Sequence, residues 1–273
     1  MNARVLLRLR NAPALRVDVA EVRPGASADD VARTRLWHGR EQIALGELFD
    51  VSTQQGETEA AELVFEGDLA RIDGIGRGLQ AGTIRVHGSA GDYAGAQMSG
   101  GELLIDGNAG VYAGCEMSGG RIAVGGNVGD FAAGALAGSM DGMRGGVIEV
   151  RGNAGERCAD RMRRGVFMLH GNAGDFLASR MVAGTLAIAG SAGAHCGYGM
   201  RRGTLVFAGA QPELPATFAP SRHDIRVYWA LLARSLERIG GAGSAFAGLA
   251  ARQPRRAVGD LAADGKGEWL LPD

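Results

Sequence analysis

Apolar and polar residues alternate in short runs that recur along the middle of the chain. Residues 83–87 read Thr-Ile-Arg-Val-His, and residues 102–106 and 147–151 follow the same alternation. A period of two residues is typical of a β-strand that buries one face. The glycine-rich stretch after each run is too short to form a crossover helix. Each run and its following stretch are therefore expected to form one coil of a solenoid.

The glycines define a repeat of nineteen residues. One series of seven glycines keeps this spacing except for a single step of 26 residues, which indicates a seven-residue insertion near 134–140. The series consists of Gly88, Gly107, Gly126, Gly152, Gly171, Gly190 and Gly209. A second series runs from Gly82 to Gly203, and six methionines from Met98 to Met200 follow the same rule. Glycines at such corners, for example Gly88 and Gly101, allow a positive φ or close packing.

Aligning the units at this spacing produces two columns of apolar residues. The first consists of Leu63, Ile84, Leu103, Ile122, Ile148, Phe167, Leu186 and Leu205. The second consists of Phe65, Val86, Ile105, Val124, Val150, Leu169, Ile188 and Phe207. Further columns are small (Ala90, Ala109, Ala154, Ala173, Ala192), aromatic (Tyr93, Tyr112, Phe131, Phe176) and formed by the methionines. The pattern predicts an all-β core, a right-handed parallel β-helix of about eight coils, since the strict six-residue repeat of left-handed helices is missing.

The two ends of the solenoid require covers, because an open stack leaves unpaired sheet edges. We expect three segments: an N-terminal cap over residues 1–62, the β-helix over 63–209, and a C-terminal helix and tail over 210–273. Within the cap, residues 27–38 read as a helix and 42–51 as a further element. Residues 224–239 place five apolar side chains on one helical face: Ile225, Trp229, Leu232, Leu236 and Ile239. Residues 240–273 are expected to be an extended tail that wraps a partner or is disordered.

Composition and charge exclude several classes of function. The formal net charge is −1, so nothing draws the chain as a whole to nucleic acid or to an anionic membrane. Lys266 is the single lysine, which excludes phosphate-binding P-loops and Schiff-base chemistry. The three cysteines form no C-x-x-C pair and no apolar run could serve as a signal peptide or membrane span. We therefore expect a cytoplasmic protein.

The usual catalytic and metal-binding patterns are missing. Gly74-Ile-Gly-Arg-Gly78 resembles part of a dinucleotide fingerprint, but no helical pattern follows it. His87 and His170 share a repeat position, yet four coils of about 4.8 Å place them roughly 19 Å apart, too far for one metal ion. We expect neither a catalytic residue nor a metal site on this chain.

Arginines gather around the methionine corner in the C-terminal half. They are Arg144, Arg161, Arg163, Arg164, Arg180, Arg201 and Arg202. Stacked guanidinium groups repel one another unless something anionic neutralises them. One interpretation is a solvated edge balanced by nearby carboxylates (Asp141, Glu156, Asp160, Asp175). The other is a strip that binds a carboxylate-rich ligand or an acidic partner surface.

Two of the repeat units carry a family resemblance. Residues 87–101 (HGSAGDYAGAQMSGG) and 106–120 (DGNAGVYAGCEMSGG) resemble the C subunit of formylmethanofuran dehydrogenase. They are more distantly similar to the glycine-rich β-helix domain of the glutamate synthase large subunit. The leader residues 36–40 (LWHGR) and 45–51 (LGELFDV) also resemble the C subunit, and the likeness covers about residues 30–210.

This resemblance implies a non-catalytic structural subunit of one of two complexes. The first is the molybdenum or tungsten formylmethanofuran dehydrogenase. The second is the bacterial formyltransferase/hydrolase complex, which moves a formyl group from tetrahydromethanopterin to a methanofuran-type carrier and releases formate. The high arginine and alanine content indicates a GC-rich genome and favours the bacterial complex.

The resemblance also implies the partners, which are amidohydrolase-like A, B and formyltransferase D-type sister subunits. No cofactor is expected to bind this chain directly. The glutamate-rich tail of the bacterial carrier would suit the arginine strip, so a carrier-binding module is a further alternative.

Overall fold

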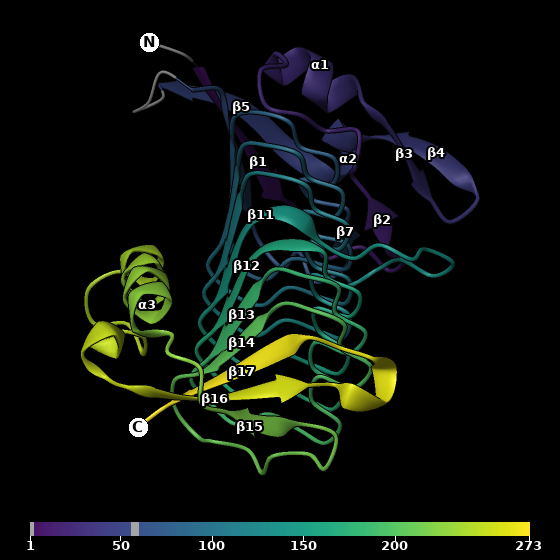
Figure 1. Cartoon of the computed structure of the whole chain (residues 1–273). Helices are drawn as coiled ribbons and strands as arrows, with labels where there is room; N and C mark the ends of the chain where they lie inside the picture. Colours follow the sequence, from purple (N-terminus) through teal and green to yellow (C-terminus); the bar gives the residue numbers. More distant parts are fainter. Residues whose placement is uncertain (1–2, 56–59) are drawn as a thin grey trace.

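The computed structural model describes residues 3–55 and 60–273 and shows a rod of stacked coils (Figure 1). Most of the regular secondary structure is β-strand, and one mostly parallel sheet runs the length of the rod. Its strand order is β15-β16-β17-β14-β13-β12-β11-β10-β9-β8-β6-β1-β5. A mostly β fold with a large parallel sheet agrees with the β-helix-like architecture expected from the repeat. The handedness of the winding stays a prediction.

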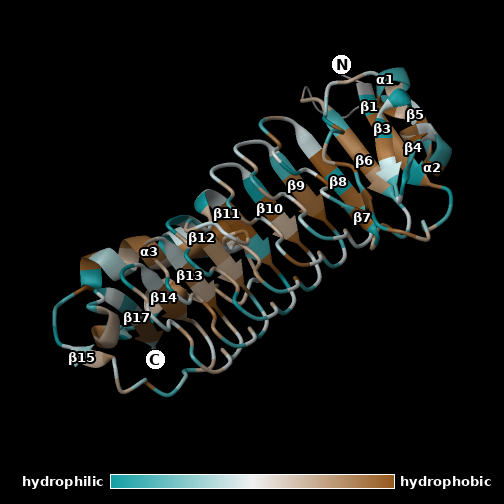
Figure 2. Ribbon diagram, turned by 90° about the vertical axis from the view of Figure 1, so that its right-hand side faces the viewer, coloured by the Kyte–Doolittle hydropathy of each residue, from teal (hydrophilic) through white to brown (hydrophobic). Residues whose placement is uncertain are grey.

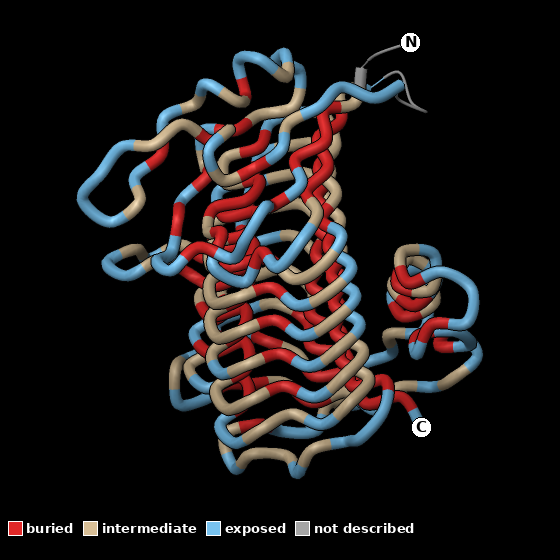
Figure 3. The backbone as a smooth tube through the Cα atoms, turned by 180° about the vertical axis from the view of Figure 1, so that it is seen from behind, coloured by how far each residue is buried: buried red, intermediate tan, exposed pale blue. Residues whose placement is uncertain are grey.

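The central part of the sheet contains one strand from each repeat unit. These strands are β6 (Glu62–Glu66), β8 (Thr83–His87), β9 (Glu102–Ile105), β10 (Arg121–Val124), β11 (Arg144–Val150), β12 (Arg164–Leu169), β13 (Thr185–Ile188) and β14 (Thr204–Phe207). Ile84 pairs with Leu103, and Leu103 pairs with Ile122, in parallel register. Both predicted apolar columns are thereby confirmed as vertical neighbours, and both are buried inside the coils (Figure 3). Figure 2 shows the same strands as a hydrophobic band along the rod.

The remaining corners of the coils are also held in register. A second ladder of single bridges links Leu69, Ala90, Ala109, Val128, Ala154, Ala173 and Ala192. The six repeat methionines are fully buried. The side-chain oxygens of Asn108, Asn127 and Asn153 each accept the backbone N–H of the residue one unit further on, at 2.7–2.8 Å.

The aromatic column lies on the outside of the coils. Tyr93 stacks on Tyr112 with ring centroids 5.2 Å apart, and Tyr112 stacks on Phe131 at 5.1 Å. All three side chains are half-buried.

The N-terminal segment extends the sheet and covers its first coil. Strand β1 (Ala3–Leu9) lies parallel to β6, and β5 (Phe49–Gln55) lies antiparallel to β1. Between them are β2 (Val17–Asp18), α1 (Ala28–Arg33), β3 (Arg35–His38), β4 (Glu41–Ala44) and α2 (Leu45–Leu48), while β7 (Ile72–Asp73) pairs with β2.

The expected helix over residues 27–38 is wrong beyond Arg33. Ser27 caps α1 by accepting the N–H of Asp30, and the helix ends at Arg33 with Thr34 as its C-cap. The next four residues form β3, which pairs with β4 in a hairpin that projects from the rod (Figure 1). Their exposed–buried alternation, with Leu36 inward, suits a strand better than a helix.

The C-terminal segment covers the other end of the rod and one outer face of the sheet. Helix α3 (Arg226–Gly240) buries Trp229 and Leu236 against Met168 and Val206 of the sheet, as the helical pattern predicts. The other elements are β15 (Ala219–Ser221), η1 (Leu249–Ala251), β16 (Pro254–Gly259), η2 (Leu261–Ala263) and β17 (Gly267–Pro272).

The expectation of a partner-wrapping or disordered tail over residues 240–273 is wrong. Strand β17 adds to β14 in parallel and pairs with β16 in an antiparallel hairpin. Trp269 is buried between Phe207 and Phe218, with ring centroids 4.8 and 4.7 Å away. The tail therefore folds on the chain's own last coil, because that coil offers an unpaired edge and an open apolar end. No helix in the part of the chain that the structure describes is long and apolar enough to cross a membrane.

Candidate functional site

Five of the seven arginines line one open groove of about 600 Å³, which we call the arginine groove. They are Arg144, Arg163, Arg164, Arg201 and Arg202. Each stands at or just before the start of a sheet strand, so the stacking of coils brings them onto one edge. In the intervening coil the same two repeat positions hold Val182 and Ala183, which form an apolar floor.

The arginine groove carries an excess of positive charge. Arg163 forms an ion pair with Asp141. Among residues 3–55 and 60–273, no carboxylate lies within ion-pair distance of the other four arginines. Of the other carboxylates expected to balance them, Asp175 accepts the backbone N–H of Ala194 instead. Within the described chain, one of the five groove arginines therefore has an ion pair. Arg144 also adds its charge to the hydrogen bonds from Ser139 and Gln97 that lower the pKa of Glu116.

Arg161 and Arg180 lie apart from this groove and surround a buried carboxylate. Arg180 binds Asp160 through Nε at 3.0 Å and Nη2 at 2.7 Å, and Asp160 also accepts the Ser179 hydroxyl at 2.5 Å. Arg161 donates to the Ser139 carbonyl at 2.8 Å. Arg161 therefore holds the insertion loop, drawn in teal in Figure 1, against the coil, and Arg180 lines the same recess while bound to Asp160.

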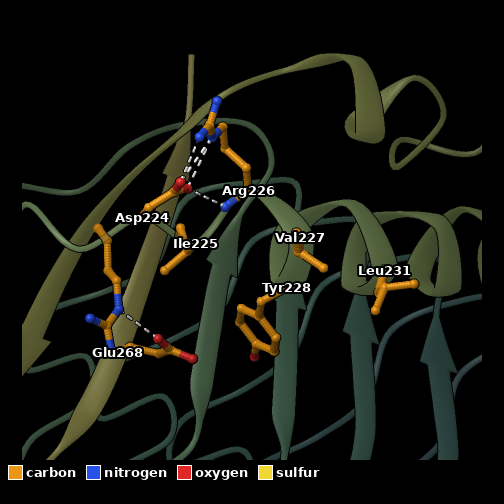
Figure 4. Close-up of a pocket in the computed structure, with 8 residues that line it drawn as sticks. Asp224, Ile225, Arg226, Val227, Tyr228, Leu231 and Glu268 are labelled. Carbon is orange, nitrogen blue, oxygen red and sulfur yellow. Dashed lines mark hydrogen bonds and ion pairs between the residues drawn. The ribbon is translucent and has the colours of Figure 1, made fainter.

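A second recess, of about 1000 Å³, lies beside the start of α3 (Figure 4). We call it the α3 pocket, and its lining residues are Asp224, Ile225, Arg226, Val227, Tyr228, Leu231, Arg256 and Glu268. The sequence pattern did not predict it, because the apolar spacing over residues 224–239 indicates only the buried face of the helix. One feature of the sequence does indicate an exposed apolar surface here: Val227 and Leu231 lie four residues apart, on the side of the helix away from Trp229.

The polar groups of the α3 pocket are paired with one another. The Glu268 carboxylate accepts the Thr204 hydroxyl at 2.7 Å and Arg256 Nε at 2.8 Å. The Tyr228 hydroxyl lies 2.9 Å from the Thr204 hydroxyl, and burial raises the pKa of Tyr228. On the rim, hydrogen bonds from Arg226 lower the pKa of Asp224 to about 2. At neutral pH the pocket thus contains neutralised pairs and no free acid or base.

The α3 pocket holds one hydroxyl on a carboxylate, Thr204 on Glu268, and that carboxylate is already paired with Arg256. The three cysteines are buried elsewhere, and burial raises the pKa of each thiol to about 12. His87 binds Asp106 and His170 binds Glu149, in separate coils. Within the described residues, no three His, Cys, Asp or Glu side chains are placed to hold a metal ion. Gly74, Gly76 and Gly78 all have a positive φ, and together they form the corner of the first coil without a following helix.

The repeat and the coil geometry define a glycine-repeat solenoid protein, and the comparisons agree. The profile of the GXGXG motif family matches residues 70–223. The C subunit of the tungsten-containing formylmethanofuran dehydrogenase 2 of Methanothermobacter thermautotrophicus is 32% identical over 97 residues, or 34% of this chain and 36% of that protein. The C subunit of the formyltransferase/hydrolase complex Fhc of Methylorubrum extorquens is 41% identical over 89 residues, or 31% and 32%. The aligned stretches thus span about a third of these curated relatives.

A solved structure extends the likeness to the whole chain. A chain in the crystal structure of the formyltransferase/hydrolase complex FhcABCD of M. extorquens, solved with methylofuran, is 40% identical. The match has a TM-score of 0.87 and covers 98% of this chain and 99% of that one. The chain belongs to the family of C subunits of formylmethanofuran dehydrogenase and formyltransferase/hydrolase complexes. The resemblance drawn from the repeat units is thereby confirmed.

Proposed function

We propose that this chain is the non-catalytic C subunit of a cytoplasmic formyltransferase/hydrolase complex in one-carbon metabolism. It holds amidohydrolase-like A, B and formyltransferase D-type subunits in fixed relation. Those subunits transfer a formyl group from tetrahydromethanopterin to a methanofuran-type carrier and hydrolyse it to formate. The observation that carries the proposal is the end-to-end likeness to a chain of the FhcABCD complex.

The architecture supports a scaffold rather than an enzyme. The interior of the coils is filled with apolar side chains, which leaves no internal cleft. We propose that the cap (1–62), a right-handed β-helix of about eight coils (63–209) and the C-terminal segment (210–273) act as one rigid spacer. A rigid rod with two covered ends keeps separate catalytic subunits at a constant distance.

Co-expression of the chain with its three sister subunits tests the scaffold. We expect one complex that contains all four chains, and we expect loss of assembly when this chain is omitted. The chain alone is expected to release no formate from a formylated carrier. A chain that stays monomeric beside its sister subunits would rule out the proposal. Stoichiometric molybdenum or tungsten in the purified complex would instead favour a C subunit of formylmethanofuran dehydrogenase.

We further propose that the arginine groove holds the anionic tail of the carrier within the complex. The groove offers four guanidinium groups without a carboxylate partner in the described residues, over an apolar floor. Arginine binds carboxylates with two parallel hydrogen bonds, so a chain of carboxylates fits this set. Arg161 and Arg180 are left out of this proposal because Asp160 already occupies them.

Binding of an oligoglutamate peptide to the complex without carrier tests this role of the groove. The double variant Arg201→Glu/Arg202→Glu should raise the Kd about tenfold or more, and the binding of the parent complex should weaken with salt. Arg222→Glu, also exposed and without a carboxylate partner in the described chain, is the matched control. Equal affinity of the double variant and the control would contradict the proposal.

A further inference from the structure

We propose that the α3 pocket is the docking site for a helix of a sister subunit that is apolar along one side and acidic at one end. This inference rests on the proposed function, since it needs a complex in which the chain has partners. It specifies where on this chain one interface lies and which kinds of side chain the partner segment presents there. Three observations carry it: an exposed apolar ridge, a floor of paired charges, and two arginines that have no ion-pair partner in the described part of the chain.

The ridge consists of the outward side chains at the start of α3. Val227 is 77% exposed and Leu231 is 65% exposed, and Tyr228 next to them is 41% exposed. Val227 and Leu231 are four residues apart, so they lie one above the other on the helix. They stand opposite the buried face of Trp229 and Leu236, so they contribute little to holding α3 on the sheet. Figure 4 shows Val227, Tyr228 and Leu231 projecting along the pocket.

The floor of the pocket favours an apolar occupant over a polar small molecule. Glu268, Arg256, Thr204 and Tyr228 satisfy one another through hydrogen bonds of 2.7–2.9 Å. A polar ligand would have to break these bonds to form its own, whereas an apolar side chain can cover them at lower cost. An open groove beside an apolar helical ridge is the arrangement in which an amphipathic helix docks.

The second half of α3 carries exposed arginines, which indicate that the partner helix is acidic at one end. Arg234 and Arg238 continue the line of Val227 and Leu231 at helical spacing, and both are exposed. Neither forms an ion pair with any described carboxylate. A partner helix parallel to α3 would therefore place apolar side chains in the pocket and carboxylates beside these two arginines. Charge complementarity of this kind also sets the orientation of docking.

A second copy of this chain fits the site less well than a different subunit. A two-fold symmetric contact with antiparallel α3 helices would set Arg234 and Arg238 of one copy against the Val227 end of the other. The carboxylate at that end, Asp224, is already bound by Arg226, so the two arginines would again lack a free partner. The two halves of the chain also differ in charge: residues 1–136 hold 12 basic and 18 acidic residues, and residues 137–273 hold 17 and 12. A head-to-tail contact between copies would satisfy the charges, but it would build rings or open chains of this subunit instead of joining it to its sister subunits.

The experiment compares variants of the full-length chain in assembly with its sister subunits. Val227→Asp and Leu231→Asp should each weaken assembly about tenfold or more, because each puts a carboxylate in the apolar contact. Arg234→Glu/Arg238→Glu should weaken assembly most at low salt. Leu15→Asp, at a leucine that is 53% exposed near the other end, is the matched control for the aspartate variants. The double variant Arg35→Glu/Arg40→Glu, at two exposed arginines of the β3–β4 hairpin, is the matched control for the charge reversal. The far-ultraviolet circular dichroism of each variant should match the parent, since the replaced side chains are exposed.

A photo-crosslinking residue at position 227 identifies the occupant in the assembled complex. A crosslink to a helical segment of a sister subunit with carboxylates at one end supports the inference. A crosslink to a second copy, no crosslink, or unchanged assembly of the aspartate variants overturns it. In each of those cases the proposal that this chain is a scaffold still stands, provided that the unsubstituted chain assembles with its sister subunits. Failure of the parent chain to assemble contradicts the proposed function instead.

Discussion

At the scale of single residues, the corners of the coils explain the glycine content. Alternate positions in each corner have a positive φ, as at residues 74, 76 and 78, and again at 93, 95 and 97. Tyr93 and Gln97 adopt this conformation at a cost of about 1–2 kcal/mol each. Glycine is required where the neighbouring coil leaves no room for Cβ. A Cβ on Gly120 would lie 2.7 Å from the Gly101 carbonyl oxygen.

Substitution of Gly120 by alanine should therefore cost more than the backbone conformation alone. Gly120 and Gly138 have the same φ of +85°, but Gly138 has no atom within 4 Å of an added Cβ. We expect Gly138→Ala to lower the free energy of unfolding by about 1 kcal/mol and Gly120→Ala by about 3 kcal/mol or more. Urea unfolding of both variants measures the difference. Equal losses would mean that coil spacing relaxes freely around the added methyl group.

The cysteines offer a second prediction at this scale. Burial raises the pKa of Cys115, Cys158 and Cys196 to about 12, so all three are neutral thiols at pH 8. Because the thiolate is the reactive form, we expect none of the three to react with a disulfide reagent in the folded chain, and all three to react in urea. Rapid labelling of one thiol without denaturant would show that its coil opens locally.

At the scale of elements, the repeat predicted the strands and their register because each contact joins positions nineteen residues apart. The aromatic column was predicted in the same way, and Tyr93, Tyr112 and Phe131 do stack. The β3–β4 hairpin and the destination of β17 could not be predicted from the repeat. Strand β17 pairs with β14 more than sixty residues away, and its sequence carries no repeat signal. The arginine groove was partly predictable, because repeat position places Arg163 and Arg201 on one edge. Asp160 was expected as a balancing carboxylate and does bind Arg180, but the repeat does not indicate that this pair lies apart from the groove.

A cluster of charged residues around Glu149 connects the sheet to the end of α3. Glu149 is 2% exposed and receives Arg121 Nη2 at 3.0 Å, Arg151 Nη2 at 2.9 Å and His170 Nε2 at 3.1 Å. Arg151 also donates to the carbonyl of Gly240 at 3.2 Å. Burial alone would raise the pKa of Glu149, but the hydrogen bond with His170 and the charges of the two arginines outweigh it, and the pKa lies below its ordinary value of 4.5.

This cluster predicts a pH-dependent contribution to stability. A depressed pKa in the folded state stabilises the chain above the unfolded pKa, and the contribution is lost as the pH falls through the folded value. Glu149→Gln should lower the free energy of unfolding by about 1–2 kcal/mol at pH 7, and the deficit should shrink below about pH 4.5. Glu102→Gln, whose partner Arg121 lies 3.6 Å away at the surface, is the control. Parallel stability curves for the parent and Glu149→Gln between pH 7 and 3.5 would contradict this account.

At the scale of the whole molecule, the rod depends on the covers at its two ends. Strands β1 and β5 continue the sheet beyond the first coil, and β17, β16 and β15 continue it beyond the last. Without such covers, a parallel stack of this kind presents a row of free N–H and C=O groups to other molecules. The C-terminal cover also closes the apolar interior, since Trp269 lies over Phe207.

Removal of residues 254–273 should therefore turn the rod into an aggregating species. The truncated chain leaves the β14 edge unpaired and exposes Phe207, so copies can add to one another through strand pairing. We expect concentration-dependent oligomers in size-exclusion chromatography, with retained β-sheet circular dichroism. Deletion of residues 134–140 is the control, because it shortens one coil to nineteen residues and leaves both covers in place. A monomeric truncated chain would show that the β14 edge is protected by its own side chains, and that the C-terminal segment serves the interface at α3 rather than the stability of the stack.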